Sequence, residues 1–127
     1  EDNHPGQEVA IEPNDVITNE VMPKLLAADM VVLVSSLYYY GINAALKAVI
    51  DRFYSYNHEP HGGKKAITLV SGYGQADAFA SLNLYFKQLL EYMRWDKVGE
   101  VLAADSWNNQ KLAKHVEEAY QLGKTVK

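Results

Sequence analysis

Two short loops, each placed directly after an apolar run, carry the residues best suited to holding a ligand. Residues 36–43 read SLYYYGIN, with three consecutive tyrosines, and residues 71–77 read SGYGQAD. Glycine allows a backbone to approach a ligand closely, and tyrosine joins an apolar ring to a polar tip. Free backbone amides beside such rings suit a flat ring with a polar edge. Two interpretations are open: a flavin-ring site, or tyrosines that pack in the core or at a subunit contact.

The candidate binding residues share one feature, which is that they follow the carboxyl ends of predicted strands. They are Ser36, Leu37, Tyr38, Tyr39, Tyr40, Gly41, Ser71, Gly72, Tyr73 and Gly74. In open parallel sheets, ligands bind just outside those strand ends. The amides of residues 39–41 are therefore expected to face the polar edge of a ring. Asp105 and Trp107 follow a third predicted strand and could rim the same edge, but the sequence assigns them no role.

Other polar residues are better explained by structural roles than by metal binding or catalysis. His58 and His61 could supply two metal ligands, yet no third ligand lies nearby, so we expect a polar turn and no metal site. Asp51 and Arg52 suit an ion pair or a helix cap, and His115 is expected at the surface. There is no nucleophile elbow, no paired catalytic carboxylates and no P-loop. No catalytic residue is assigned, and an enzyme of this sequence would need a cofactor.

Composition narrows the classes of partner. The chain has 127 residues, which suits one domain, and a formal net charge of −4 without a basic stripe, which argues against nucleic acid. It contains no cysteine, which excludes disulfides, cysteine-ligated iron–sulfur clusters and thiol catalysis. No apolar run is long enough to span a membrane, and the first residues do not resemble a signal peptide. We expect a cytoplasmic protein with neither a membrane nor a nucleic-acid partner.

Hydrophobic periodicity predicts alternating strands and helices. Strands are expected at residues 30–34, 66–70 and 98–103, and helices at 15–28, 43–56, 78–94 and 111–124. A short extended piece is expected at residues 8–11. Strand 30–34 is expected to be buried on both faces, and residues 95–97 to form a turn. Pro23 should kink or split its helix, and Asn43 should cap the next. This order predicts an α/β fold with a parallel sheet and helices on both faces.

The stretch SSLYYYGINAALK at residues 35–47, followed by IDRFY at 50–54, closely resembles the NAD(P)H-dependent FMN reductase family of flavodoxin-like proteins. Within that family it looks most like the branch of iron–sulfur flavoproteins and their cluster-free relatives, which read S/T-P-L-Y-Y-x-G-M-S-A-Q-L-K-x-x-I-D-R-F-Y. Ser36 stands where the pattern has proline, and Asn43 where it has serine. The resemblance extends from about residue 15 to near the carboxyl end.

This resemblance implies a three-layer doubly wound sheet of order 2-1-3-4-5, in which residues 30–34 are the third strand. It implies bound FMN, NAD(P)H as electron donor, a small acceptor such as a flavin or quinone, and a homo-oligomer. The alternative is a flavodoxin-like electron carrier or assembly module without turnover. The family phosphate loop and cluster cysteines have no counterpart here, so residues 1–127 are expected to be one N-terminally incomplete domain. The strand at residues 30–34 would then be an open edge that associates with another chain, is covered by residues absent from this sequence, or aggregates.

Overall fold

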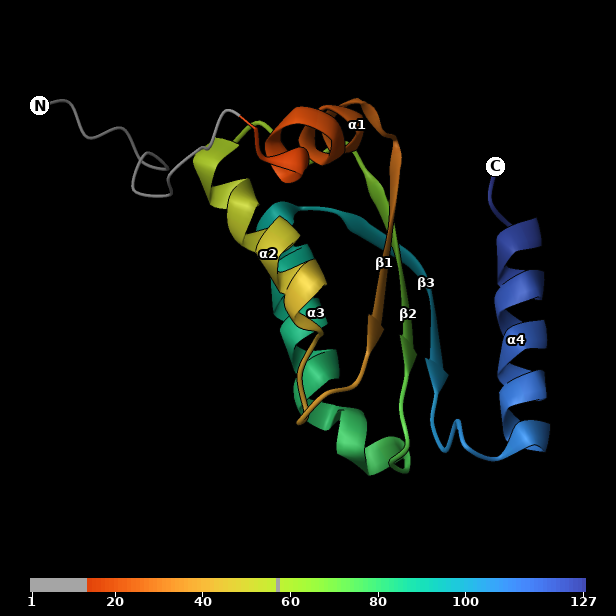
Figure 1. Ribbon diagram of the computed structural model, residues 1–127. Coiled ribbons are helices and arrows are strands. Elements are labelled where there is room, and N and C mark those ends of the chain that lie inside the picture. Colours follow the sequence, from red (N-terminus) through yellow and green to blue (C-terminus); the bar gives the residue numbers. More distant parts are fainter. Residues whose placement is uncertain (1–13, 57) are drawn as a thin grey trace, which may run out of the picture.

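Three parallel strands form the centre of the molecule (Figure 1). The computed structural model describes residues 14–56 and 58–127, so the expected extended piece at residues 8–11 lies outside the described residues. The strands are β1 (Met30–Ser36), β2 (Lys65–Ser71) and β3 (Asp96–Ala103), and they lie in the order β1-β2-β3. Each pairs in parallel with its neighbour, with Val34 opposite Leu69 and Leu69 opposite Val101. The predicted parallel sheet is confirmed.

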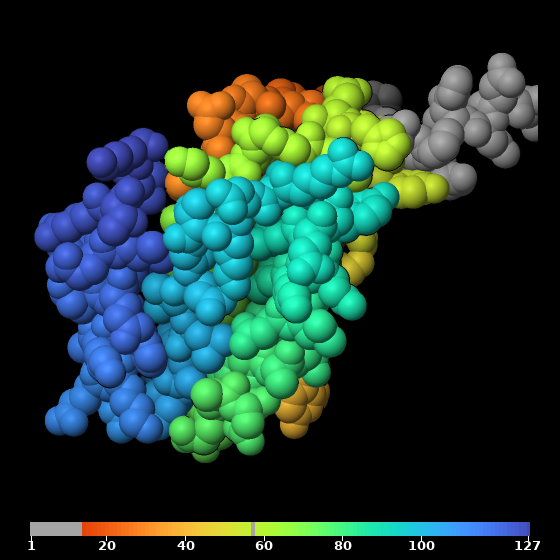
Figure 2. Space-filling model, turned by 180° about the vertical axis from the view of Figure 1, so that it is seen from behind, coloured from red at the N-terminus to blue at the C-terminus, as the bar shows by residue number. Residues whose placement is uncertain are grey.

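Helices lie on both faces of this sheet, which gives the predicted three layers (Figure 1). On one side lie α2 (Ala44–Arg52), with its 3-10 extension Phe53–Tyr56, and α3 (Ala80–Met93), which follows a 3-10 turn at Ala76–Phe79. On the other side α4 (Asn109–Lys124) packs mainly against β3. Seen from behind, β3 and α3 form one continuous surface with α4 at its flank (Figure 2). The α/β class is confirmed.

The core lies between the sheet and the α2–α3 layer. Its largest side chains are fully buried, namely Met22, Phe79, Leu82, Phe86 and Met93. Trp95 joins them at 4% exposure, and its indole Nε1 donates a hydrogen bond to the Pro60 carbonyl at 2.7 Å. The expected turn at residues 95–97 is therefore wrong, because Trp95 is a core residue and β3 already begins at Asp96.

The first helical segment is split as the proline predicted. A π-helical turn, Ile17–Val21, leads into α1 (Met22–Ala27), and Pro23 sits in the first turn of α1, where a missing amide hydrogen costs nothing. Asp15 anchors this segment, since its carboxylate accepts hydrogen bonds from the Thr18 hydroxyl at 2.9 Å and from the Ile17 amide at 3.3 Å. The same carboxylate lies 2.9 Å from the Arg52 guanidinium at the end of α2.

One face of β1 is open, which corrects the expectation that this strand is buried on both faces. Val32 is 47% exposed and Val34 is 57% exposed. Leu33, between them, is buried in the core. Side chains alternate across a strand, so Val32 and Val34 point to the α4 side of the sheet. Among the described residues, α4 packs mainly against β3, and β1 pairs only with β2.

The inward face of α4 also differs from expectation. The apolar spacing of residues 111–124 predicts that Leu112, Val116, Ala119 and Gly123 face inward, but Val116 is 61% exposed and Gly123 is exposed. The face turned to the sheet instead includes Leu122, whose side chain lies over Gly99 of β3 so closely that a Cβ there would meet it at 2.5 Å. His115, expected at the surface, is half-buried in this layer because it lies one turn after Leu112.

Asp15 should make stability depend on pH. Partial burial tends to raise the pKa of Asp15, but the hydrogen bonds from Thr18 and Ile17 and the Arg52 charge outweigh it and hold that pKa below its ordinary value. A carboxyl with a lowered folded-state pKa stabilises the fold above its unfolded pKa of about 3.9, and this contribution is lost as pH falls through the folded value. Asp15→Asn should therefore be less stable than wild type at pH 7, with a deficit that shrinks below about pH 4.

Urea unfolding of both proteins between pH 7 and pH 3 measures this deficit. Asp51→Asn is the control, because Asp51 pairs with Lys47 in the open, where an ion pair contributes little. A deficit for Asp15→Asn that stays constant over this pH range would contradict the assignment.

Candidate functional site

The loops that follow β1, β2 and β3 are joined by backbone hydrogen bonds at one edge of the sheet, the lower edge in Figure 1. The Leu37 amide donates to the Ser71 carbonyl at 2.7 Å, and the Gly72 amide donates to the Ala103 carbonyl at 3.1 Å. The sequence predicted that the first two loops would lie together at this edge, and the structure does bring them together. It adds the third loop, to which the sequence assigned no role.

The loop after β1 turns at Tyr39 and Tyr40. The Gly41 amide donates to the Tyr38 carbonyl at 3.0 Å, and the Tyr38 amide donates to the Gly41 carbonyl at 3.1 Å. Both central residues are left-handed, with φ of 47° at Tyr39 and 68° at Tyr40, which defines a type I′ turn. Asn and Gly are the usual residues in that turn, so two tyrosines there store backbone strain. Strain of this kind is concentrated at functional sites.

The turn leaves two amides and three rings exposed. Among the hydrogen bonds of the described residues, none uses the amide of Tyr39 or Tyr40 as donor. The Gly41 amide, which was also expected to face a ring, is instead engaged within the turn. Tyr38 and Tyr40 are 61% and 64% exposed, and Tyr39 is 99% exposed. The turn therefore offers donors and aromatic surface together to solvent.

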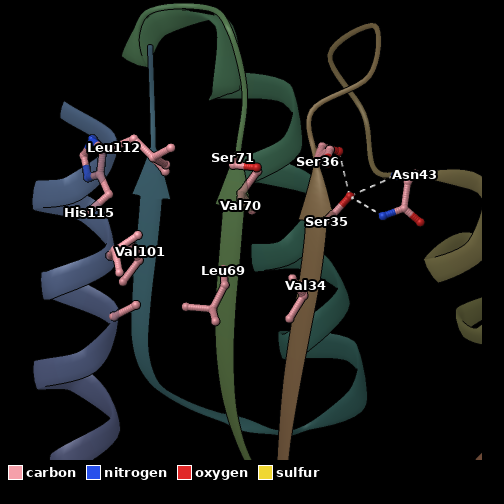
Figure 3. A pocket seen from close by; sticks show the side chains of 13 residues that line it. Val34, Ser35, Ser36, Asn43, Leu69, Val70, Ser71, Val101, Leu112 and His115 are labelled. Carbon is pink, nitrogen blue, oxygen red and sulfur yellow. Dashed lines mark hydrogen bonds between the residues drawn. The ribbon is translucent and has the colours of Figure 1, made fainter. Parts of the chain in front are cut away.

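A buried hydroxyl fixes the base of this loop, and the sequence did not reveal it. Ser35 is 3% exposed, and its Oγ accepts hydrogen bonds from the Asn43 backbone amide at 2.9 Å and from Asn43 Nδ2 at 3.1 Å (Figure 3). The same hydroxyl donates to the Ser36 carbonyl at 2.8 Å. Asn43 caps α2 as predicted, since its Oδ1 accepts from the Leu46 amide at 2.8 Å. Both ends of the tyrosine loop are thus tied to one point.

Gly72 allows the three loops to meet. It is buried, and a Cβ at this position would lie 2.9 Å from Leu37 Cβ and 2.9 Å from Phe79 Cζ. Tyr73, next to it, is 73% exposed. Glycine is required at position 72 because the neighbouring side chains leave no room for a Cβ.

The loop after β3 folds back onto Gly72 and Gly74. The Ser106 amide and Oγ both donate to the Gly72 carbonyl, at 3.0 and 2.9 Å, and the Asp105 amide donates to the Gly74 carbonyl at 2.9 Å. Asp105 is left-handed, with φ of 51°, and its carboxylate lies 2.7 Å from Lys111 Nζ. The hydrogen bond from Lys111 lowers the pKa of Asp105, so this carboxylate is charged at neutral pH.

A cleft of about 330 Å³ lies on the open side of the sheet, between α4 and the strands (Figure 3). Its floor is apolar and includes Val34, Leu69 and Val101. Its polar end holds Ser36 and Ser71, two of the expected binding residues. The lining does not include the tyrosines of the turn. The expected site residues therefore fall into two sets: the exposed tyrosines of the turn, and the serines Ser36 and Ser71 in the cleft.

His58 and His61, which were expected to lie in a polar turn, are away from these loops, in the connection from α2 to β2. The rings of His58 and His61 meet edge to face at 5.1 Å, and His61 packs against Tyr92 of α3 at 5.0 Å. Partial burial, with the nearby charges of His58 and Arg94, lowers the pKa of His61. Residues 14–56 and 58–127 contain no cluster of three or more His, Cys, Asp or Glu residues arranged to hold a metal ion.

The sequence places the chain in a family of redox enzymes. Residues 3–109 match the family model of NADPH-dependent FMN reductase, which covers most of the chain. The chain therefore belongs to the NADPH-dependent FMN reductase family, an oxidoreductase family, as the tyrosine-loop motif indicated. The narrower assignment to the iron–sulfur flavoprotein branch stays a prediction. Comparison with curated protein sequences gives no match.

Solved structures confirm the flavodoxin-like fold. The Trp repressor binding protein from Bacillus subtilis is 17% identical, with a TM-score of 0.63 over 79% of this chain and 74% of that one. An NADPH-quinone reductase from P. pentosaceus is 17% identical, with a TM-score of 0.62 over 84% of this chain and 74% of that one. A flavone reductase is 16% identical, with a TM-score of 0.67 over 92% of this chain and 47% of that one. This chain thus spans between 47% and 74% of their lengths.

No helix within the described ranges combines the length and apolarity that a membrane crossing requires.

Gly72→Ala tests whether the close approach of Leu37 and Phe79 to Gly72 holds the strand-end loops together. The new methyl group would force Leu37 or Phe79 to move, and overpacking of this kind costs about 1–3 kcal/mol of unfolding free energy. Gly41→Ala is the matched control, because its Cβ would meet only the Tyr38 carbonyl at 3.8 Å, and we expect a change within about 0.5 kcal/mol. Urea denaturation followed by circular dichroism measures both. Equal losses from the two variants would contradict the packing described for Gly72.

Proposed function

We propose that the chain holds FMN at the strand-end loops and passes electrons from NAD(P)H through it to a small acceptor such as a flavin or a quinone. Bound FMN would supply the redox chemistry, taking hydride from the nicotinamide and releasing electrons to the acceptor. The residues of the chain bind and orient the ring. The observation that carries the proposal is the strained type I′ turn, which presents two unused amides between three exposed tyrosine rings.

The tyrosine turn fits the polar edge of a flavin. The pyrimidine part of the ring carries carbonyl and ring-nitrogen acceptors, and the amides of Tyr39 and Tyr40 are donors without partners in the described part of the chain. Tyr38 and Tyr40, on either side of Tyr39, offer ring faces for stacking. Because Ser35 and Asn43 fix the base of the loop, these groups are held in place before a ligand arrives.

The two serine hydroxyls in the cleft fit the polyol chain of the cofactor. Ser36 and Ser71 lie at the polar end of the cleft, next to the strand ends. The three loops at residues 36–43, 71–77 and 104–110 contain no lysine or arginine. Binding through these loops would therefore depend on ring stacking and neutral donors, and much less on attraction between a phosphate and a positive side chain.

The second candidate is an electron carrier or assembly module without turnover. Steady-state oxidation of NADPH by the FMN-loaded protein, with a quinone as acceptor, separates the two: an enzyme consumes many equivalents, and a carrier stops after one. We also propose a cytoplasmic location, since the absence of cysteine from the sequence is compatible with it.

Tyr40→Asn tests the ring contact without changing the turn. Asparagine tolerates the left-handed conformation that Tyr40 adopts, so the backbone should stay while the aromatic face is lost. An aromatic stacking contact contributes about 0.5–1.5 kcal/mol, so the FMN dissociation constant should rise about 2- to 12-fold. Quenching of FMN fluorescence on titration with protein measures it.

Tyr120→Asn supplies the control for this titration. Tyr120 is a comparably exposed tyrosine on α4, at 60%, and its replacement should leave FMN binding unchanged. An unaltered dissociation constant for Tyr40→Asn, or no saturable quenching by the wild-type protein, would contradict the proposed function.

We also propose that copies of this chain associate through β1. Beyond β2, no strand of the described residues pairs with β1, so its other edge is open there. This edge is seven residues long and carries no charge, proline or bulge, which are the features that normally block edge pairing. The exposed Val32 and Val34 add apolar surface beside that edge. A second copy is a fitting occupant, because two identical uncharged edges can pair in antiparallel fashion without repulsion.

Val34→Lys should weaken this self-association. The side chain is 57% exposed, so a lysine can be placed there with little effect on the fold, while its charge disfavours pairing at the adjacent edge. Sedimentation velocity should show a shift toward monomer. Leu84→Lys, at an equally exposed apolar site on α3, should sediment like wild type. Dissociation by Leu84→Lys alone would place the contact on the helical face and refute the edge model.

A further inference from the structure

Two large aromatic side chains lie next to each other in solvent at the loops after β2 and β3. Tyr73 is 73% exposed and Trp107 is 78% exposed, and their rings meet edge to face with centroids 6.0 Å apart. Single exposed aromatic residues are ordinary, but an adjacent pair of this size is a patch. The other tryptophan behaves in the opposite way, since Trp95 is 4% exposed and its indole N–H is hydrogen-bonded to Pro60.

The exposure of this pair does not come from a loose loop. Asp105, two residues before Trp107, is held by the ion pair with Lys111 and by the hydrogen bond that its backbone amide donates to the Gly74 carbonyl. Asn108, directly after Trp107, caps α4 by accepting hydrogen bonds from the Gln110 and Lys111 amides, both at 3.1 Å. The backbone on each side of the indole is therefore fixed. A rigid aromatic surface needs little ordering when a ligand binds.

The place of the pair in the sheet separates it from the tyrosine turn. The strand order is β1-β2-β3, so the loop of β2 lies between the turn after β1 and the loop that carries Trp107. Ser71 and Gly72 join the two sides through their hydrogen bonds to Leu37 and Ala103. The same edge thus presents one aromatic group around Tyr38–Tyr40 and a second around Tyr73 and Trp107.

We propose that Tyr73 and Trp107 form a stacking surface for the second substrate, and that this substrate is a neutral fused-ring quinone. The indole face and the phenol ring offer flat apolar contact, and the indole N–H, without a partner among the described residues, can donate to a ring carbonyl. The nearby carboxylate of Asp105 is already neutralised by Lys111, so the surface favours an uncharged ligand. The role of the quinone as acceptor rests on the proposed function, whereas its binding to this pair does not.

In the complete reaction one hydride equivalent from NAD(P)H and one proton convert the quinone to a hydroquinone, and NAD(P)⁺ is released. The two carbonyl groups of the quinone become two hydroxyl groups, so atoms and electrons balance. Tyr73 and Trp107 take no part in the electron transfer. They position the acceptor and set its affinity.

The two tryptophans provide the test, because each gives one indole N–H cross-peak in a ¹H–¹⁵N correlation spectrum. The protein is titrated with 2-methyl-1,4-naphthoquinone, in the absence and in the presence of excess FMN. We expect the Trp107 cross-peak to shift saturably in at least one of these titrations, while the buried Trp95 cross-peak stays in place as an internal control. Cyclohexane-1,4-dione, which has two carbonyls but no aromatic ring, should give no saturable shift.

Variants at Tyr73 then identify the stacking contact. Tyr73→Ala should raise the dissociation constant of the naphthoquinone about 2- to 12-fold, and Tyr73→Phe, which keeps the ring, should restore it. Trp107→Ala should raise the KM for the naphthoquinone while leaving the KM for ferricyanide and the dissociation constant of FMN unchanged.

Three results would overturn the proposal: no saturable shift at Trp107 under either condition, equal shifts at both tryptophans, or weaker FMN binding by Trp107→Ala. The last result would make the pair part of the cofactor site. Failure of the wild-type protein to bind FMN would refute the proposed function instead, and the naphthoquinone titration would still decide whether this pair binds a quinone.

Discussion

The close approach of backbone and side chains at Gly72 is the constraint on which the rest of the site depends. Leu37 and Phe79 leave no room for a Cβ, and the Gly72 amide and carbonyl bind Ala103 and Ser106 respectively. One residue thereby sets the distance between the loops after all three strands. If this contact opened, the tyrosine turn and the Trp107 loop would still form locally, but they would no longer lie at fixed positions relative to each other.

Strain and exposure occur together at this edge of the molecule. Of the four left-handed non-glycine residues in the described part of the chain, Tyr39, Tyr40 and Asp105 lie in the strand-end loops, and the fourth, Arg94, ends α3. The core beneath these loops is well packed by residues such as Phe79 and Phe86. A stable base allows unfavourable backbone conformations above it to persist. The chain belongs to the NADPH-dependent FMN reductase family. Under the proposed function, this arrangement would supply the rigid surface that positions a flavin ring and leaves one side open to substrates.

The sequence predicted those features that depend on short-range patterns. Runs of β-branched residues located β1 and β2, and the motif at residues 35–54 located the tyrosine loop, the Asn43 cap and the family. Features that depend on what packs against a residue were not predictable. Both faces of β1 read as apolar, yet in the part of the chain that the structure describes only the side of Leu33 is covered. Local sequence placed Trp95 in a turn. Its burial depends on packing and on a hydrogen bond to Pro60, 35 positions away, which local sequence does not reveal.

The division of labour within the site was hidden for the same reason. Ser35 looked like the end of a strand, and its role depends on Asn43, eight residues later. Trp107 could be placed at the correct edge from its position after β3, but its contact with Tyr73 depends on hydrogen bonds between two loops that are far apart in the sequence. These contacts decide which of the expected residues expose a ring, which leave a backbone donor exposed and which support the loops.

Amide hydrogen exchange in the tyrosine turn shows whether this turn contacts the flavin ring. In the free protein the Tyr39 and Tyr40 amides should exchange rapidly, since neither has an acceptor among the described residues, whereas the Gly41 amide is bonded to Tyr38. With saturating FMN, exchange at Tyr39 and Tyr40 should slow markedly, while that at Gly41 should change little. Unchanged exchange at Tyr39 and Tyr40 in the FMN-bound protein would contradict the assignment of this turn to the flavin ring.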